Sequence, residues 1–167
     1  MNSLELIALK DFPDVEPGNN IVELIINNIN TNNVPIDDFD VIVIAQKVIS
    51  KAENRYIDLD NINISDQAKK LALKLKKDKG LVQAIINESN KIISTEKNVI
   101  IVEHKLGFIN INAGIDQSNI PQADNLALLL PENPSKSAEV IQTNLSNQLN
   151  KKLSVICLLY TSDAADD

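Results

Sequence analysis

Apolar and polar residues follow two different periods along this chain, and each period predicts one type of element. Apolar positions three and four residues apart predict helices at about 21–30, 68–75, 81–89 and 138–149. Short runs that are apolar, or that alternate with polar residues, predict strands at 3–9, 40–45, 91–94, 98–103, 107–112, 125–130 and 153–159. The run at 40–45 is nearly continuous in apolar residues, which is typical of a strand buried on both faces, and 153–159 is predicted to be a buried strand. The pattern predicts an α+β fold with mixed sheets flanked by helices.

Residues that favour helix starts stand one to five positions before three of the predicted apolar helical stretches. Asn20 precedes the first, Ser65 the second and Asn133 the last. Each side chain carries an oxygen that can accept a hydrogen bond from the free backbone N–H groups of a first helical turn. Pro134 suits the first position of the last helix, because no N–H donor is needed there. We therefore expect these helices to begin at these residues.

Composition limits the classes of partner. The 167 residues fit one domain or part of a larger one. Hydrophobic residues make up 44% and aromatic ones only 3%, so the core must be built from aliphatic side chains. The net charge of −7 argues against a nucleic-acid partner, which would require a basic face. The apolar runs are too short to cross a bilayer and no signal segment opens the chain, so we expect no membrane partner and a cytoplasmic location.

The single cysteine and the single histidine carry no evident chemistry in the sequence. Cys157 supports no disulfide and lies in an apolar run, so it is predicted to be a small core residue. His104 stands near the turn between two predicted strands, without a cluster of other metal ligands around it in the sequence. It is predicted to be an exposed loop residue.

The strand predicted at 107–112 breaks at Ala113 and Gly114 into a polar turn that carries the carboxylate of Asp116 and the hydroxyl of Ser118. A carboxylate on a loop held at a strand end is a typical way to hold a hard metal ion against phosphate oxygens. A preceding glycine lets the backbone come close to a ligand. The alternative is an Asx turn, in which Asp116 or Asn119 bonds only its own backbone. The residues alone favour this alternative over a metal site.

Several segments resemble one known family. Residues 112–121, Asn-Ala-Gly-Ile-Asp-Gln-Ser-Asn-Ile-Pro, resemble the signature loop of the coenzyme F420-0:γ-glutamyl ligase family, whose members add glutamate to a precursor of coenzyme F420. Residues 46–55 resemble the family's strand-to-turn segment ending Ser-Lys-Ala-Glu-Gly-Arg, with Asn54, which tolerates a left-handed conformation, in place of glycine. Further matches lie at 77–89 and 131–138. The resemblance runs from about Leu4 to Ile156.

This resemblance implies an amide-forming ligase that uses GTP. GTP would phosphorylate a carboxylate of coenzyme F420-0, and the amine of L-glutamate would displace phosphate from the acyl phosphate. The implied metal is Mg²⁺ or Mn²⁺, with K⁺ as a further cation, and Asp116 matches the family's metal-binding position. Family members resemble intertwined dimers, so a homodimer is expected. The positions that match GTP contacts are Phe12, Pro13, Asp14, Val15, Gln46, Lys47, Lys51 and Asn119.

The resemblance stops near the end of the chain. The family carries Thr-Asp-Thr-x-Gly-Arg after the last predicted strand, and its aspartate and second threonine help to hold the metal pair. Leu159 and Tyr160 stand at those two positions. We therefore expect residues 1–156 to be the N-terminal part of a ligase-like domain, and 157–167 to be a non-native or divergent tail. The chain alone is expected to be weak or inactive. The alternatives are a non-catalytic fragment for nucleotide binding or dimerisation, and a related amide ligase with another carboxylate acceptor.

Overall fold

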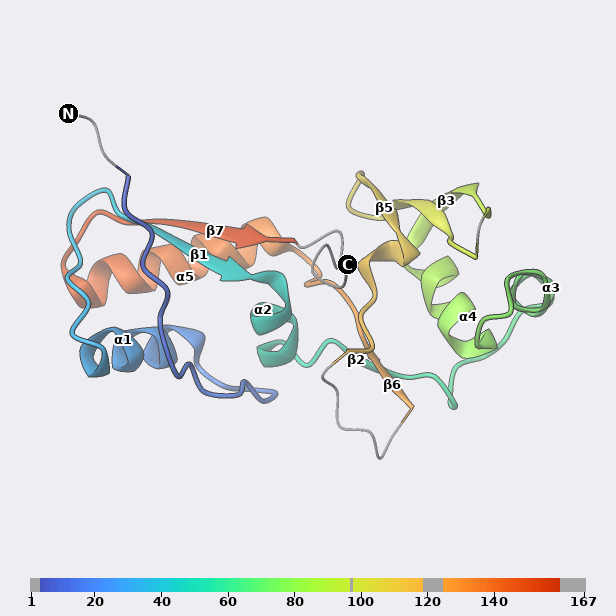
Figure 1. Ribbon diagram of the computed structural model, residues 1–167, viewed down its shortest axis with the longest axis horizontal. Coiled ribbons are helices and arrows are strands. Elements are labelled where there is room, and N and C mark those ends of the chain that lie inside the picture. The colour runs from blue at the N-terminus through green and yellow to red at the C-terminus, as the bar shows by residue number, and fades with distance from the viewer. Residues whose placement is uncertain (1–3, 97, 119–124, 160–167) are drawn as a thin grey trace. The chain divides into compact units, whose positions relative to one another are not determined.

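The computed structural model describes residues 4–96, 98–118 and 125–159, and within these residues the chain forms two compact units (Figure 1). The first unit contains the described residues up to Asn54 together with Pro131–Leu159, and the second contains those from Arg55 to Leu130. The chain therefore leaves the first unit after Asn54 and returns to it at Pro131. The α+β fold class predicted from the sequence is confirmed.

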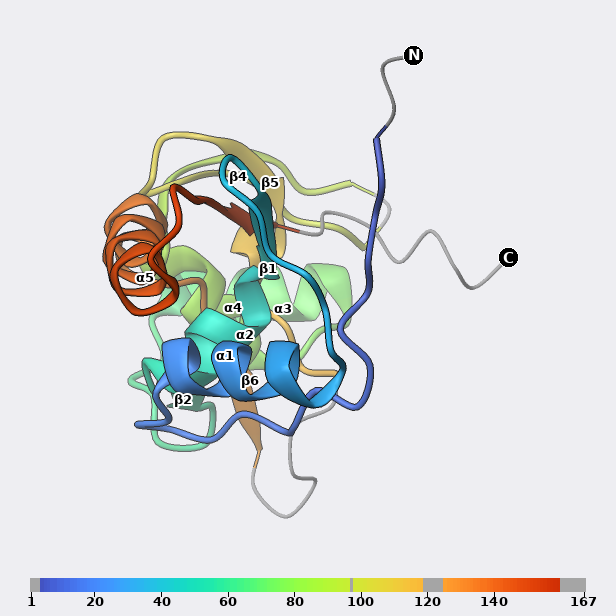
Figure 2. The same ribbon diagram turned by 90° about the vertical axis from the view of Figure 1, so that its left-hand side faces the viewer.

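The first unit is a two-stranded parallel sheet with helices on one face. Strand β1 pairs with β7 from Val41↔Ser154 to Ala45↔Leu158. Figure 2 shows α1, α2 and α5 on the same side of this sheet. Their apolar residues join the inward side chains of both strands in one core. The elements are α1 (Ile21–Thr31), β1 (Val41–Ala45), α2 (Gln46–Ala52), α5 (Pro134–Leu149) and β7 (Ser154–Leu158).

The predicted helix starts are confirmed by their capping bonds. The Asn20 side chain accepts from the N–H of Val22 at 3.1 Å, and α1 begins at the next residue. The Asn133 side chain accepts from the N–H of Lys136 at 2.9 Å, and Pro134 occupies the first turn of α5. A cap of this kind contributes about 1 kcal/mol to helix stability. These helix ends are therefore set by local chemistry.

The second unit contains two helices and two small antiparallel sheets. One sheet has the order β3-β4-β5, and the other pairs β2 with β6. Helices α3 and α4 pack their buried residues against the inner face of the three-stranded sheet, where Ile100 and Val102 are fully buried. The Ser65 side chain caps α3 as predicted, by accepting from the N–H of Ala68 at 3.2 Å. The elements are β2 (Tyr56–Asp58), α3 (Asp66–Leu75), α4 (Lys79–Asn87), β3 (Ser89–Ser94), β4 (Ile101–His104), β5 (Ile109–Ile111), the 3₁₀ turn η1 (Asn112–Gly114) and β6 (Leu126–Leu128).

The predictions that 40–45 is buried on both faces and that 153–159 is a buried strand are wrong for the described residues. The helices cover only one face of the β1–β7 sheet, so alternate residues of each strand lie on the other face. Val41 and Val43 are 51% and 53% exposed, and Ile156 and Leu158 are 48% and 40% exposed. A continuous apolar run therefore predicts a strand here, but it does not predict whether one or both faces of that strand are covered.

Two further predictions about local structure need correction. Residues 4–9 form no strand, because no described strand pairs with them, and Leu4 and Leu6 are 87% and 86% exposed. The segment 46–55 is not a strand-to-turn connection, because helix α2 begins at Gln46 directly after β1. Asn54 then takes the left-handed conformation expected of it, with φ 54°.

None of the helices in the described part of the chain is both long enough and apolar enough to cross a membrane.

Candidate functional site

The loop 10–18 of the first unit is held in place at both ends. The side-chain amide of Asn28, on α1, donates to the carbonyl of Lys10 at 3.1 Å, and that of Asn32 donates to the same carbonyl at 3.2 Å. At the other end, the N–H of Gly18 donates to the carbonyl of Ala52 at 2.9 Å. The structure therefore brings the end of this loop to the end of helix α2.

The four loop residues predicted to contact GTP divide into two kinds. Phe12 packs against the core of the first unit and Val15 is only 6% exposed, so these two anchor the loop. Pro13 and Asp14 are exposed. The apolar pair holds the loop, and the exposed pair is the part that a ligand can reach.

Helix α2 carries the three remaining GTP candidates of the first unit. Gln46 is 8% exposed, and its side-chain oxygen accepts from the hydroxyl of the fully buried Ser50 at 2.9 Å. Lys47 and Lys51 are half-buried and lie four residues apart, so they share one face of the helix. Two ammonium groups on one face, next to a neutral buried pair, favour an anion such as a phosphate chain.

The turn with Asp116 lies in the second unit. Its backbone pairs with Leu128 through two hydrogen bonds of 3.0 and 2.8 Å, so the residue is held beside β6. Its carboxylate oxygen Oδ1 accepts from both the N–H and the hydroxyl of Ser118, each at 2.7 Å. This is the Asx-type geometry, and the same carboxylate is the candidate metal ligand. Asn119, the remaining GTP candidate, lies outside the described residues.

The structure explains why a glycine occupies position 114 in this turn. Its φ is +66°, and a Cβ placed on it would lie 3.0 Å from Leu130 Cδ1 and 3.1 Å from Asn110 Nδ2. A side chain at this position would be strained by both conformation and packing. The glycine is therefore explained by packing inside the protein, without a ligand.

Asp116 and Ser118 offer hard oxygen donors, the type that Mg²⁺ and Mn²⁺ prefer. Within 4–96, 98–118 and 125–159, however, no three His, Cys, Asp or Glu side chains come together as a metal-ligand set. One carboxylate seldom retains such an ion unless phosphate and water complete the shell. The described residues therefore fit one part of a metal site and do not form a complete one.

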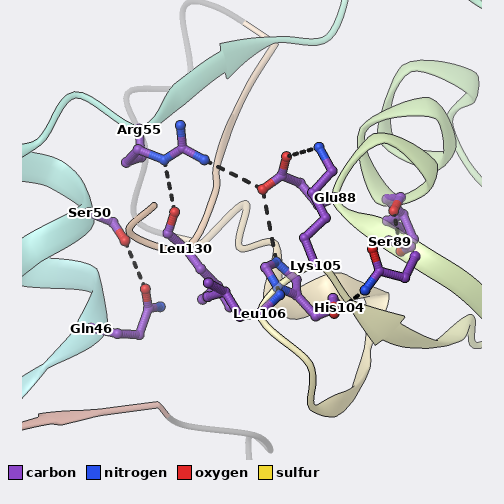
Figure 3. A network of polar contacts seen from close by, with 11 residues as sticks. Gln46, Ser50, Arg55, Glu88, Ser89, His104, Lys105, Leu106 and Leu130 are labelled. Atoms are coloured by element: carbon purple, nitrogen blue, oxygen red, sulfur yellow. Dashed lines mark hydrogen bonds and ion pairs between the residues drawn. The ribbon is translucent and has the colours of Figure 1, made fainter. Parts of the chain in front are cut away.

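A charged cluster in the second unit was not predicted from the sequence. Figure 3 shows Arg55, His104 and Lys105 directed toward the carboxylate of Glu88, which ends helix α4. The distances from their nitrogen atoms to the Glu88 oxygens are 3.4, 3.9 and 3.6 Å. Arg55 Nε also donates to the carbonyl of Leu130 at 2.8 Å.

His104 is buried, so its prediction as an exposed loop residue is wrong. It is 2% exposed and its ring stacks on Phe108, with centroids 5.1 Å apart. The reason is its register, because Ile100, Val102 and His104 alternate onto the inner face. Its Nδ1 accepts from the N–H of Leu106 at 3.0 Å, which places the proton of the neutral ring on Nε2. Burial lowers the pKa of His104, while Glu88 opposes that shift.

Comparison with known proteins decides the family. The model of the family described as F420-0:Gamma-glutamyl ligase matches residues 10–166. The chain belongs to this family. A coenzyme F420:L-glutamate ligase of Methanothermobacter thermautotrophicus is 40% identical over 153 residues, which cover 92% of this chain and 60% of the relative. That of Methanocaldococcus jannaschii is 43% identical over 122 residues, 73% of this chain and 48% of the relative.

A third relative, a coenzyme F420:L-glutamate ligase of Halorubrum lacusprofundi, is 36% identical over 149 residues, which cover 86% of this chain and 56% of the relative. The chain thus spans about half to 60% of the length of these curated relatives. The family match extends over residues 157–166, where the sequence predicts a non-native or divergent tail, and that expectation stays a prediction.

Proposed function

We propose that this chain carries the nucleotide-binding part of a ligase that joins L-glutamate to coenzyme F420-0 with the use of GTP. The observation that carries the proposal is the similarity to two proteins named coenzyme F420:L-glutamate ligase, at 40% and 43% identity. The geometry supports a phosphate-binding role for the first unit, since the loop 10–18 ends beside helix α2 and its two lysines. The use of GTP, of coenzyme F420-0 and L-glutamate as substrates, and of a bound cation are all parts of this proposal.

In the proposed reaction, a carboxylate oxygen of coenzyme F420-0 attacks the γ-phosphorus of GTP, and GDP leaves. The amine of L-glutamate then attacks the acyl carbon, loses a proton and displaces phosphate, so that an amide forms. Lys47 and Lys51 would neutralise phosphate charge, and Pro13 and Asp14 would lie against the nucleotide. Asp116, in the second unit, would be one ligand of a Mg²⁺ or Mn²⁺ ion, which supplies charge neutralisation when bound.

Nucleotide binding is tested by measuring the GDP and GTP affinity of the 167-residue chain by calorimetry. We expect Lys51→Ala to weaken binding about tenfold, or about 1.4 kcal/mol, because one charge-assisted contact to phosphate is lost. Lys70→Ala is the matched control, since Lys70 is an exposed lysine of the second unit. Equal affinities of the two variants, or no nucleotide binding by the unmodified chain, would contradict the proposal.

Catalysis is tested separately. By the resemblance, Leu159 stands at the position of a metal-binding aspartate of the family, so we propose that the chain transfers glutamate weakly or not at all. Chromatography of F420-0 incubated with GTP, glutamate and the chain would detect the amide product. GDP binding without product favours a nucleotide-binding role, whereas rapid product formation would refute the proposed loss of activity. Product formed only with another carboxylate acceptor would favour a related amide ligase.

We also propose that the chain associates with itself as a homodimer. Light scattering across a hundredfold range of protein concentration tests this. A constant monomer mass over that range would rule the dimer out.

A further inference from the structure

The chain between β5 and Asp116 turns in the left-handed region at three successive residues. The φ angles of Asn112, Ala113 and Gly114 are 48°, 55° and 66°. Glycine adopts such angles freely and asparagine tolerates them, but alanine does not. A backbone of this kind persists only when the surrounding structure holds it, and such positions cluster at functional sites.

Asn112 supplies the polar contacts that hold this turn. Its backbone N–H donates to the carbonyl of Ile100 at 2.7 Å, and its side-chain Oδ1 accepts from the N–H of Ile100 at 3.3 Å. One residue therefore binds both backbone groups of Ile100, which is fully buried and needs partners for them. The carbonyl of Asn112 also accepts from the N–H of Ile115 at 3.1 Å, which closes the turn.

Packing prevents the turn from shifting. Ala113 is fully buried among the apolar residues of the second unit. Gly114 lies so close to Leu130 and Asn110 that even a Cβ atom would force its neighbours to move. The turn is thus held by hydrogen bonds on one side and by close contacts on the other.

The segment delivers Asp116 to its place beside Leu128, four residues after Asn112. We propose that Asn112 is a positioning residue, which holds the left-handed turn so that the Asp116 carboxylate is presented to a cation in a fixed orientation. This inference rests on the proposed function, because it assumes that Asp116 binds a metal ion there. It adds a role for a residue that touches no substrate or metal itself.

The test compares two substitutions at Asn112 and one at Asp116 in the 167-residue chain. Asn112→Gly keeps the left-handed conformation and removes the acceptor, whereas Asn112→Asp keeps both. Asp116→Asn removes the carboxylate itself. Asn98→Gly is the matched control, because Asn98 is an exposed asparagine of the same unit with a φ of 61°.

Two readouts are measured on each variant. The first is Mn²⁺ affinity by electron paramagnetic resonance in the presence of GDP. We expect about tenfold weaker binding for Asn112→Gly, a loss too large to detect for Asp116→Asn, and values within about threefold for Asn112→Asp and Asn98→Gly. The second is hydrogen exchange of the Asp116 and Leu128 amides, which should be at least about tenfold faster in Asn112→Gly alone.

The outcomes separate positioning from general stability and from the proposed function. Unchanged Mn²⁺ affinity in Asn112→Gly, at a temperature where it is folded, would overturn the inference even if its melting temperature fell. If the unmodified chain binds no Mn²⁺ with GDP, the proposed metal role of Asp116 fails. Hydrogen exchange of the Asp116 amide then tests only whether Asn112 holds the turn. Unchanged protection of that amide in Asn112→Gly would show that Asn112 does not position Asp116.

Discussion

Polar side chains lie inside both units, but the first unit buries them as neutral pairs and the second adds a charged cluster. Gln46 and Ser50 satisfy each other within one helix of the first unit. In the second unit, the carboxylate of Glu88 is 15% exposed and is shared by three basic side chains. Neutral pairs depend little on pH or counter-charges, whereas a cluster around one carboxylate depends on both.

The two regions also differ in how completely their polar atoms are satisfied. Among the described residues, the buried side-chain nitrogen atoms without a hydrogen-bond partner are His104 Nε2 and Asn110 Nδ2, and both belong to the second unit. An unsatisfied buried donor costs about 1–3 kcal/mol. The comparison therefore predicts that the second unit is the more easily destabilised by changes in charge, and the following experiments are ordered by expected effect.

The largest effect is expected from Glu88→Gln, which removes the charge that the cluster shares. Arg55 is 19% exposed and would lose its contact with the Glu88 carboxylate, so we expect the second unit to lose about 2–3 kcal/mol of stability. Amide hydrogen exchange in α3 and α4 measures this loss. The control is Glu139→Gln, because Glu139 pairs with Lys136 at the surface of the first unit and its loss should change stability by less than about 0.5 kcal/mol. Equal effects of the two substitutions would remove the basis of the comparison.

The next effect concerns pH. Because burial lowers the pKa of His104, the unfolded chain binds a proton at this residue, near pH 6.5, before the folded chain does. Stability should therefore be fully present above that pH and fall as the pH drops below it, by at most about 1.4 kcal/mol per pH unit. Urea unfolding at pH 7.5, 6.5 and 5.5 would detect the fall. The variant His104→Gln should lack this part of the pH dependence, and an unchanged profile would mean that His104 is not its source.

A smaller effect is expected for the neutral pair of the first unit. Ser50→Ala removes the hydroxyl that donates to Gln46 and should cost about 1 kcal/mol in urea unfolding. The double variant Gln46→Leu and Ser50→Ala removes both polar partners, so it should recover most of that loss. A double variant less stable than Ser50→Ala would show that Gln46 has a further structural role.

The sequence predicts those parts of this structure that local chemistry decides. Asn20, Ser65 and Asn133 cap their helices as expected, because a cap needs only its own helix. The turn at Ala113 and Gly114 after β5 also follows from the sequence, although β5 ends at Ile111, one residue before the predicted strand end. Strand β2 was not predicted, because its three residues become a strand only by pairing with β6, about seventy residues later.

The candidate site is harder to predict from the sequence, because it too depends on contacts between distant segments. The carboxylate of Asp116 stands out in the sequence, but its pairing with Leu128 and the left-handed turn before it depend on contacts with distant residues. The burial of His104 does have a signal in the sequence, because Ile100, Val102 and His104 occupy every second position and therefore lie on one face of the strand. The partners Arg55 and Glu88 carry no such signal, because their contact joins segments far apart in the chain.

The smallest effect is expected on the uncovered face of the β1–β7 sheet. Val43 is 53% exposed, so Val43→Thr should change the free energy of unfolding by less than about 0.5 kcal/mol. Val102→Thr makes the same change at a fully buried strand position of the second unit and should cost about 1–3 kcal/mol, because it buries a hydroxyl. Urea unfolding of both variants at two protein concentrations completes the test. Val43→Thr would contradict this expectation if it cost as much stability as Val102→Thr, and more at the higher protein concentration. That result would mean that a second copy of the chain covers the exposed face of the β1–β7 sheet in solution. The difference between the two units would then hold only for the isolated chain.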